Sequence, residues 1–285
     1  MKTSQEQMKN ESVLITGAST GIGYSTAIYL DKMGFNVYAC VRKEADKKKL
    51  QENSSKRLKV LILDVCDPNS IHSAYEHIQR ITNDETFHLI NNAGLSINGP
   101  LELLDYSEIK KVIDVNLTGL LTVTNIFLPL IRRSKGRIIN ISSGHGLLAI
   151  PDKSVYAASK FGVQAVCDSL RVELKPFEVE VISIIVGKVN TSVLGKILDG
   201  RTAMIEKASA ESYEVYKTLI EYFDKEVKNI PGIEAVKVAE TIEAALTDKK
   251  PKVKYLVGPG AKKMDSLRKF PARMRDKMLY KAVYR

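Results

Sequence analysis

The sequence feature that most constrains the fold is a glycine-rich turn near the start of the chain. It follows an apolar, strand-like run over residues 12–16 and leads into an apolar-periodic helix that ends near Met33. Strand, turn and helix in this order present backbone N–H groups and the positive end of a helix dipole, which together suit a pyrophosphate. Gly17 allows the tight turn, and Gly21 and Gly23 allow the backbone to approach the ligand closely. The residues predicted to hold a dinucleotide here are Gly17, Ser19, Thr20, Gly21, Ile22 and Gly23.

Short β-branched runs and longer apolar-periodic segments alternate along the rest of the chain. The short runs predict strands over residues 36–41, 59–63, 87–90, 136–141, 179–185 and 253–256. The longest periodic segments predict helices over residues 107–131, 155–175 and 233–246. Such alternation is typical of an α/β fold in which helices connect the strands of a parallel sheet. No linker-like stretch divides the 285 residues, so we predict a single domain.

The ends of the second and third predicted strands carry residues that bear on the choice of cofactor. Arg42 and Lys43 stand where an NAD site usually places a carboxylate for the ribose 2′-hydroxyl. A basic pair matches a 2′-phosphate instead, because a guanidinium binds phosphate in a bidentate manner. This favours NADP(H) over NAD(H), and the alternative is that both side chains are solvated loop cations. Asp64, which Val65 follows, either reaches the adenine amino group or caps the helix after Pro68.

The fourth predicted strand runs into an Asn-Asn-Ala-Gly turn, whose small residues and amides suit a strand end beside a cofactor. Asn92, Ala93 and Gly94 are therefore predicted cofactor contacts, and a purely structural turn is the alternative. Asn116 lies inside the next predicted helix, where asparagine is a mediocre helix former. Because a buried amide needs a partner, Asn116 is either a satisfied core group or the holder of a water that connects Lys160 to solvent.

A hydroxyl, a phenol and an ammonium form the predicted catalytic group. Ser143 lies at the end of a predicted strand, and Tyr156 and Lys160 share one face of the next helix. A phenol titrates near pH ~10 and is a poor acid or base at neutral pH unless its anion is stabilised. We expect the Lys160 ammonium to lower the pKa of Tyr156, which then passes a proton to a carbonyl oxygen while Ser143 donates a hydrogen bond to that oxygen. Taken alone, a Tyr-x-x-x-Lys pair also occurs by chance on many helices.

Together these motifs resemble those of the short-chain dehydrogenase/reductase family, over roughly residues 10–258. The matching residues, in the order of the family, are Thr16-Gly17, Gly21-Ile22-Gly23, Asn91-Asn92-Ala93-Gly94, Asn116, Ser143, Tyr156 and Lys160. The resemblance implies a Rossmann-type, doubly wound parallel sheet of seven strands with helices on both faces. It implies that Ser143, Tyr156 and Lys160 are the catalytic triad and that Asn116 is a fourth, relay member. Tyr156 and Lys160 also belong to the cofactor site, where the lysine of the family binds the nicotinamide ribose.

The chain departs from the family pattern in two places. After the sixth strand the family often has Pro-Gly and then a threonine, whereas this chain has Val186 before Gly187 and Thr191. Gly187, Val189 and Thr191 remain the expected contacts of the nicotinamide, but the loop lacks the stiff proline. His88 stands where an aspartate is frequent, and we assign it no function.

Residues 187–232 form a predicted substrate lid, because ligand crevices of open α/β sheets lie beyond the carboxyl ends of the strands. Its aliphatic and aromatic side chains favour a bulky apolar substrate such as a steroid, a retinoid or an acyl chain, unless they only pack the lid on the body. The lid and the C-terminal tail are loosely similar to those of the 17β-hydroxysteroid and retinol dehydrogenase branch. The predicted substrate contacts are Ser143, His145, Leu147, Tyr156, Val193 and Leu194.

The composition changes in a tail over residues 259–285, which follows the predicted domain of residues 1–258. From Ala261 onward nine cations face two anions, so the tail carries +7 of the formal net charge of +10. Apolar residues recur among these cations at helical intervals: Met264, Leu267, Phe270, Met274, Met278 and Ala282. This is typical of a basic amphipathic helix on an anionic membrane. The alternative is that the stripe folds back over the substrate entrance while the cations are solvated. Nucleic-acid binding is not expected, because the charge is confined to one tail without a recognition motif.

Composition and cysteine spacing constrain the compartment and the partners. The first eleven residues are polar and no long apolar run follows, so we expect a cytoplasmic protein, with surface contact to a membrane as an addition. Three widely spaced cysteines suit a reducing compartment and predict no metal site. The two long predicted helices, 107–131 and 155–175, resemble those through which family members dimerise, so a homodimer or homotetramer is expected.

The motifs predict an NADP-dependent oxidoreductase that moves a hydride between the nicotinamide and a carbonyl or secondary alcohol of an apolar small molecule. One alternative is an alcohol dehydrogenase that prefers NAD. A second alternative is a dinucleotide-binding regulatory or scaffold protein without turnover, and a third is a membrane-tethering role for the tail with catalysis secondary.

Overall fold

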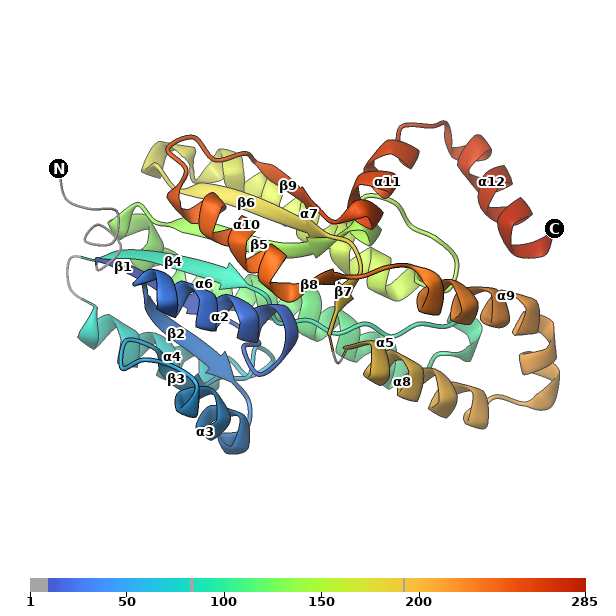
Figure 1. Ribbon diagram of the computed structural model, residues 1–285, viewed down its shortest axis with the longest axis horizontal. Coiled ribbons are helices and arrows are strands. Elements are labelled where there is room, and N and C mark those ends of the chain that lie inside the picture. Colours follow the sequence, from blue (N-terminus) through green and yellow to red (C-terminus); the bar gives the residue numbers. More distant parts are fainter. Residues whose placement is uncertain (1–9, 83–84, 192) are drawn as a thin grey trace.

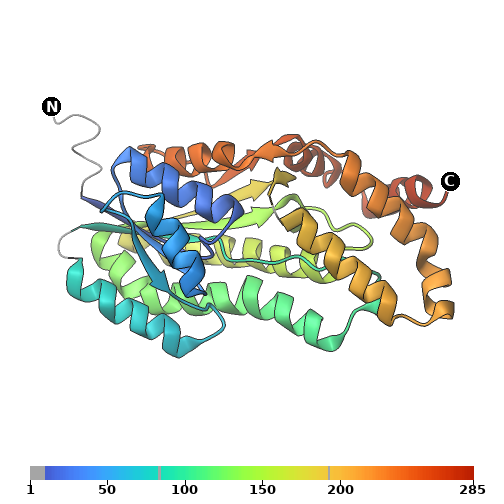
Figure 2. The ribbon, with the colours of Figure 1, turned by 60° about the horizontal axis from the view of Figure 1, so that its bottom comes forward.

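The computed structural model describes residues 10–82, 85–191 and 193–285. A seven-stranded parallel sheet lies at its centre, with helices on both faces (Figures 1 and 2). From edge to edge the strands are β3 Lys59–Ile62, β2 Asn36–Val41, β1 Glu11–Ile15, β4 Thr86–Asn91, β5 Arg137–Ser143, β6 Glu180–Val186 and β9 Lys254–Val257. The chain winds outward from β1 to one edge and then from β4 to the other, which creates a crevice at the carboxyl ends of β1 and β4. The predicted doubly wound α/β fold is confirmed.

The helices divide between the two faces of the sheet. One face carries α2 Gly21–Met33, α3 Glu44–Glu52 and α10 Ala235–Thr247. The other face carries α4 Pro68–Ile81, α6 Gly119–Ser134 and α7 Ser154–Glu173. Both faces of the strands are therefore buried, which explains why their sequences read as continuous apolar runs.

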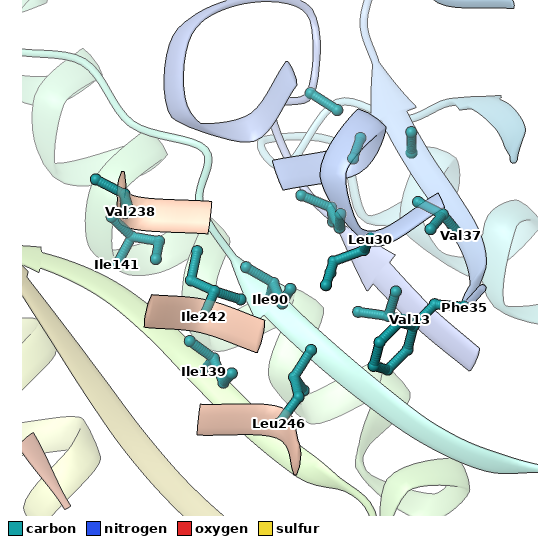
Figure 3. Close-up of a cluster of buried hydrophobic side chains, with 14 of the residues drawn as sticks. Val13, Leu30, Phe35, Val37, Ile90, Ile139, Ile141, Val238, Ile242 and Leu246 are labelled. Atoms are coloured by element: carbon teal, nitrogen blue, oxygen red, sulfur yellow. The ribbon is translucent and has the colours of Figure 1, made fainter. Parts of the chain in front are cut away.

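The packing between the sheet, α2 and α10 forms one of the two main cores. Ile90 of β4 and Ile139 of β5 meet Leu30 of α2 and Ile242 of α10, and all four side chains are fully buried (Figure 3). Burying a side chain of this size contributes about 1.5–3 kcal/mol. This core holds α2, and with it the glycine-rich turn, at a fixed position against the sheet.

The helix that follows β3 begins at a side-chain cap, but not the one that the sequence suggests. The Asp67 carboxylate accepts a hydrogen bond from the Asn69 backbone N–H at 3.0 Å, and Pro68 occupies the first turn. Asp64 instead accepts a hydrogen bond from the Cys66 N–H at 2.9 Å. The capping role considered for Asp64 is therefore wrong, because Asp67 lies one residue before the helix and has the geometry of the cap.

The predicted regular helix over residues 107–131 is interrupted in the structure. It consists of α5 Tyr106–Ile113, a π-helical turn η2 Asp114–Thr118 and then α6. Single π turns are rare and often occur at functional sites. The wide turn contains Asn116, whose amide points inward and binds the backbone of Leu95. One extra residue in a helical turn hardly changes the hydrophobic periodicity, so the sequence predicted a continuous helix.

This composite helix, Tyr106–Ser134, is long and apolar enough to cross a membrane by length and composition alone, with a mean hydropathy of 1.4. In the folded chain, Val123, Phe127 and Ile131 on it are fully buried against the sheet. Its apolar character thus supplies part of the core.

The lid and the tail lie beyond the carboxyl edge of the sheet. The lid consists of α8 Val193–Lys207 and α9 Ala210–Asn229, and the short strands β7 Val189–Asn190 and β8 Ile233–Glu234 pair at its base. The tail forms α11 Pro259–Leu267 and α12 Ala272–Tyr284 (Figure 1). Short 3₁₀ turns complete the chain: η1 Leu101–Leu103, η3 Gly144–Gly146 and η4 Lys175–Phe177. The helix predicted over 233–246 begins as β8 and continues as α10.

Candidate active site

The glycine-rich turn has the shape of a cradle because its neighbours leave no room for side chains. Gly17 and Gly21 adopt positive φ angles of 67° and 60°, which favour glycine. A Cβ on Gly17 would lie 2.8 Å from Cα of Ala93, and a Cβ on Gly23 would lie 2.4 Å from the side chain of Asn92. The first turn of α2 carries no acidic residue, and Thr20 makes no side-chain capping hydrogen bond. The start of α2 therefore suits a phosphate group, and the residues fit a dinucleotide.

Asn92 holds this cradle from the neighbouring strand. Its side-chain Nδ2 donates to the carbonyl oxygens of Thr16 at 2.9 Å and Gly17 at 3.0 Å. In return, the Thr16 hydroxyl accepts hydrogen bonds from the backbone N–H groups of Asn92 and Ala93, both at 3.0 Å. The structural role applies to Asn92, whose amide braces the turn. A Cβ on Gly94 would lie 3.6 Å from Nζ of Lys160.

The other predicted adenosine contacts lie at the ends of their strands. Arg42 and Lys43 follow β2 directly and are both exposed. Asp64 and Val65 follow β3, which pairs with β2. The structure thus brings these side chains to the same edge of the sheet as the glycine turn.

The three residues expected near the nicotinamide have different surroundings. Thr191 faces the glycine turn, because a Cβ on Gly21 would lie 3.3 Å from its methyl group. Gly187 is wedged against the start of α11, where its Cβ would lie 3.1 Å from the backbone nitrogen of Ala261. Val189 pairs with Ile233 in the small lid sheet and packs on the core. Only Thr191 therefore has a side chain placed toward the cradle by these contacts.

Ser143 and Tyr156 meet at the end of β5. Ser143 is the last residue of β5 and Tyr156 lies in the first turn of α7. The Ser143 hydroxyl lies close to the phenol and lowers the pKa of Tyr156, by less than burial raises it. The structure thus brings together the strand-end hydroxyl and the phenol that were predicted from the sequence to be catalytic.

Lys160 lies one turn along α7, but its effect on Tyr156 differs from expectation. Its Nζ donates to the carbonyl oxygen of Ile141 at 3.0 Å and lies 6.0 Å from the centre of the Tyr156 ring. Burial lowers the pKa of Lys160 to about 8. The expected lowering of the Tyr156 pKa by this ammonium is wrong for the protein on its own: the pKa of Tyr156 is raised by burial. The phenol is thus held in its protonated form at neutral pH.

Asn116 connects the turn after β4 to the catalytic helix. Its Oδ1 accepts from the Leu95 N–H at 2.8 Å, and its Nδ2 donates to the Leu95 carbonyl at 2.9 Å and to the Ser159 hydroxyl at 3.0 Å. The Ser159 hydroxyl in turn donates to the carbonyl of Tyr156 at 2.7 Å. Both polar atoms of the Asn116 amide are hydrogen-bonded, so the first of the two alternatives, a satisfied core group, describes it. Asn116 positions the backbone around the site.

The predicted substrate contacts do not all face the site. The His145 ring lies edge-on to Tyr156, with 5.9 Å between ring centres. Burial lowers the pKa of His145 to about 4, so the imidazole is neutral at physiological pH. Leu147 is buried against Ile185 and Ala261, which gives it a packing role beneath α11. The side chains of Val193 and Leu194, at the start of α8, lie outside the described part of the structure.

Sequence reasoning missed a buried ionic cluster between the lid and the loop before Tyr156. Arg201 of α8 donates to the Asp152 carboxylate at 2.6 Å, and its Nε lies 3.4 Å from the Asp224 carboxylate of α9. Nζ of Lys153 lies 3.7 Å from Asp152, and burial lowers the pKa of Lys153 to about 8. The signal available in the sequence was the adjacent pair Asp152 and Lys153 just before the catalytic tyrosine. No periodicity indicates that a lid arginine forty-nine residues later completes the cluster.

The chain is similar in sequence to known proteins. A profile of the short chain dehydrogenase family matches residues 11–202. Retinol dehydrogenase 7 of Rattus norvegicus is 34% identical over 263 residues, which cover 90% of this chain and 83% of that protein. The mitochondrial D-beta-hydroxybutyrate dehydrogenase of Bos taurus is 34% identical over 271 residues, which cover 88% of this chain and 78% of that protein.

A solved structure with a similar fold is a short chain dehydrogenase from Burkholderia cenocepacia J2315 in complex with NADP. It superimposes with a TM-score of 0.72 and 23% sequence identity, and it covers 98% of this chain and 100% of that chain. At this identity the similarity shows the fold alone.

Proposed function

Because the chain belongs to the short-chain dehydrogenase/reductase family, whose members are oxidoreductases that bind a nicotinamide dinucleotide, we propose that it uses NADP(H) to interconvert a carbonyl and a secondary alcohol on a bulky apolar substrate. The observation that carries this proposal is the pair of neighbouring hydroxyl groups, Tyr156 and Ser143, at the end of β5. It lies at the carboxyl edge of the sheet, where the glycine cradle, Gly94 and Thr191 also lie. A proton donor and a dinucleotide site at one edge are what hydride transfer to a carbonyl requires.

The side chains divide the proton chemistry between them. When bound, the cofactor supplies or accepts the hydride. Ser143 donates a hydrogen bond to the substrate oxygen, and Tyr156 gives that oxygen its proton. Because burial raises the pKa of Tyr156, the phenol carries its proton at neutral pH, which suits the reductive direction. Asn116 and Ser159 keep the backbone of Tyr156 in place.

The preference for NADP(H) is supported by the tip of β2. Arg42 and Lys43 are exposed directly after this strand, and the first carboxylate of the segment, Glu44, lies inside α3. An exposed guanidinium at this edge offers a 2′-phosphate a bidentate partner. A preference for NAD(H) is the competing outcome.

The apolar substrate is supported by the apolar packing between lid and body. Met204 and Ile220 of the lid pack with Val155, the residue before Tyr156, in one hydrophobic cluster. Steroids, retinoids and other lipid-like ketones or aldehydes are apolar molecules that match side chains of this kind. Relatives named for retinol and for hydroxybutyrate are equally similar to this chain, at 34% identity, so similarity alone does not choose the substrate.

The test is turnover of NADPH with a panel of apolar ketones and aldehydes, with short keto acids as the contrasting class. We expect Tyr156→Phe to lower kcat at least about 100-fold, because it removes the proton donor. Cofactor binding, measured by fluorescence of bound NADPH, should persist in this variant. Undiminished turnover in Tyr156→Phe would refute the assigned acid. Tight NADPH binding without turnover on any substrate would instead favour the regulatory or scaffold alternative.

The cytoplasmic location also remains a proposal. It is supported by the cysteines: Cys40 and Cys167 are buried free thiols, and Cys66 is an exposed one. Free thiols of this kind persist in a reducing compartment. Fractionation of cells that express the tagged protein would test it, and recovery from an oxidising compartment would contradict it.

A further inference from the structure

We propose that the tail helix α12 and the bend before it, residues 268–271, dock the protein on the surface of an anionic lipid bilayer. The proposal concerns a surface of the tail and does not depend on turnover. It would place the lid, and the site that the lid covers, next to a source of lipophilic molecules.

The tail exposes apolar side chains that the body leaves uncovered. Phe270 in the bend is 44% exposed, and Met274 and Met278, one turn apart on α12, are 48% and 46% exposed. Tyr280 and Tyr284 are 56% and 48% exposed, and their rings pair at 5.1 Å. Tyrosine is enriched at membrane–water interfaces, where its ring meets the lipid and its hydroxyl meets water. These five residues, the docking face, lie along α12 and in the bend before it.

The tail also carries positively charged side chains between these apolar residues. From Ala261 onward the tail holds nine Lys and Arg against two Asp. Lys277 and Lys281, one turn apart on α12, are exposed, and neither has an ion-pair partner within residues 10–82, 85–191 and 193–285. Unpaired lysines beside exposed Met and Tyr match both components of an anionic bilayer surface: the headgroup charge and the acyl chains.

The opposite side of α12 is already occupied. Val283 is 7% exposed and packs with Leu219 and Phe223 of α9. This contact holds α12 against α9 of the lid, and the docking face is made of α12 residues that remain exposed. Of the apolar stripe predicted from the sequence, Phe270, Met274 and Met278 remain exposed, whereas α12 packs on the lid through Val283, which lies outside that stripe.

The tail also contacts the catalytic loop. Met264 of α11 fills the space beside Gly144, where a Cβ would lie 2.4 Å from its sulfur, and Ser143 is the preceding residue. On the other side, α9 carries Asp224, which faces the Arg201–Asp152 pair before Tyr156. A bilayer that binds α12 would therefore hold the elements that frame the site.

The experiment is co-sedimentation of the full chain with vesicles of phosphatidylcholine, with and without phosphatidylserine. We expect binding to the phosphatidylserine vesicles only, and a loss of binding when salt is raised from about 0.1 M to about 1 M, because the Debye length falls from about 10 Å to about 3 Å. Lys277→Glu/Lys281→Glu should weaken the partition constant at least about 30-fold, since two attractive charges near the surface are lost. Met274→Ser/Met278→Ser should weaken it as well, without changing the charge.

The matched control is Lys249→Glu/Lys250→Glu, which makes the same charge change in the exposed loop between α10 and β9, at the other end of the molecule (Figure 1). It should retain most of the binding. Equal losses in the two charge-reversed proteins, or equal binding to neutral vesicles, would overturn the proposal. A concentration-dependent dimer that the Met274→Ser/Met278→Ser change dissociates would assign the docking face to a second copy of the chain and would also overturn it. Thermal unfolding of each variant shows whether it is folded, and NADPH turnover is not needed for any outcome.

Discussion

Tyr156 shows how the setting of a residue changes its chemistry. The sequence suggested a phenol made more acidic by a neighbouring ammonium, whereas in the structure burial dominates and raises its pKa. Lys160 is itself buried, and its Nζ binds the carbonyl of Ile141. The same low dielectric that disfavours the phenolate also disfavours the ammonium. The free protein therefore holds Tyr156 as an acid.

The buried Lys160 should make the free energy of unfolding depend on pH. The pKa of Lys160 falls from 10.5 to about 8 on folding, so the unfolded chain binds more protons between these two pH values. The free energy of unfolding should therefore rise as the pH increases from 8 toward 10.5. We expect a smaller rise in Lys160→Met, measured by urea unfolding at each pH, and the full rise in the exposed control Lys249→Met. A Lys160→Met protein with an unchanged slope would show that this lysine is not the cause.

Arg42 provides a test of cofactor choice at a single side chain. Arg42→Ala should raise the KM for NADPH by about 10-fold or more, because a charge-assisted bidentate contact is lost, and should change the KM for NADH little. The measurement is steady-state kinetics with both cofactors on one substrate, with Lys249→Ala as the control. Equal effects on the two cofactors would remove the argument for a 2′-phosphate site.

At the scale of elements, the lid is joined to the catalytic loop by a buried ion pair. Arg201 of α8 is 4% exposed and Asp152 is 4% exposed, so neither charge is well solvated. Asp152 also adopts a positive φ of 69°, and its carbonyl accepts from the Gly99 N–H at 3.0 Å. This pair fixes α8 against the loop that precedes α7. Its removal should therefore disturb both stability and the position of the lid.

Neutralising Asp152 leaves the buried Arg201 with Asp224 as its remaining carboxylate partner, at 3.4 Å. Asp152→Asn should lower the free energy of unfolding by about 3 kcal/mol, and adding Arg201→Met should recover part of that loss. The exposed pair between Lys207 of α8 and Asp105, at 2.8 Å, is the control, and Asp105→Asn should change stability little. Denaturant unfolding of the single and double variants measures the coupling. Additive losses in the Asp152/Arg201 cycle would show that the two side chains do not stabilise each other.

At the scale of the whole molecule, the face of the sheet that carries α6 and α7 remains partly apolar on its outer side. Leu121 of α6 is 43% exposed, and Phe161 and Val172 of α7 are 42% and 73% exposed. Scattered exposed apolar residues are common, but these lie on the two long helices that the family resemblance linked to dimerisation. We propose that a second copy of the chain covers them in a homodimer, or in a homotetramer built from such dimers.

A charged substitution on the outer side of α6 or α7 should dissociate the proposed dimer. Phe161→Glu should shift the protein toward a monomer in sedimentation velocity, because a carboxylate would be buried in the interface. Val215→Glu is the control, since Val215 is 71% exposed on the lid helix α9. A wild-type protein that sediments as a monomer at all concentrations would contradict the proposed dimer.

The features that could be predicted from the sequence are those that depend on local order along the chain. The parallel α/β fold followed from alternating strands and helices, because strands buried on both faces are continuous apolar runs and helices have a period of 3.6 residues. The glycine turn followed from the spacing within one strand–turn–helix unit, and Ser143 with the Tyr156–Lys160 pair followed from the spacing within another. These features are local, so the sequence displays them directly.

Features that depend on residues far apart in the chain became visible only after folding. Packing left Tyr156 only partly exposed and raised its pKa, turned Asn116 inward on a π-helical turn, and brought Arg201 to Asp152. It also sorted the tail into a side that packs on the lid and a side that remains exposed. Burial and electrostatics depend on the distance in space between groups, and the folded chain sets that distance independently of their separation in sequence.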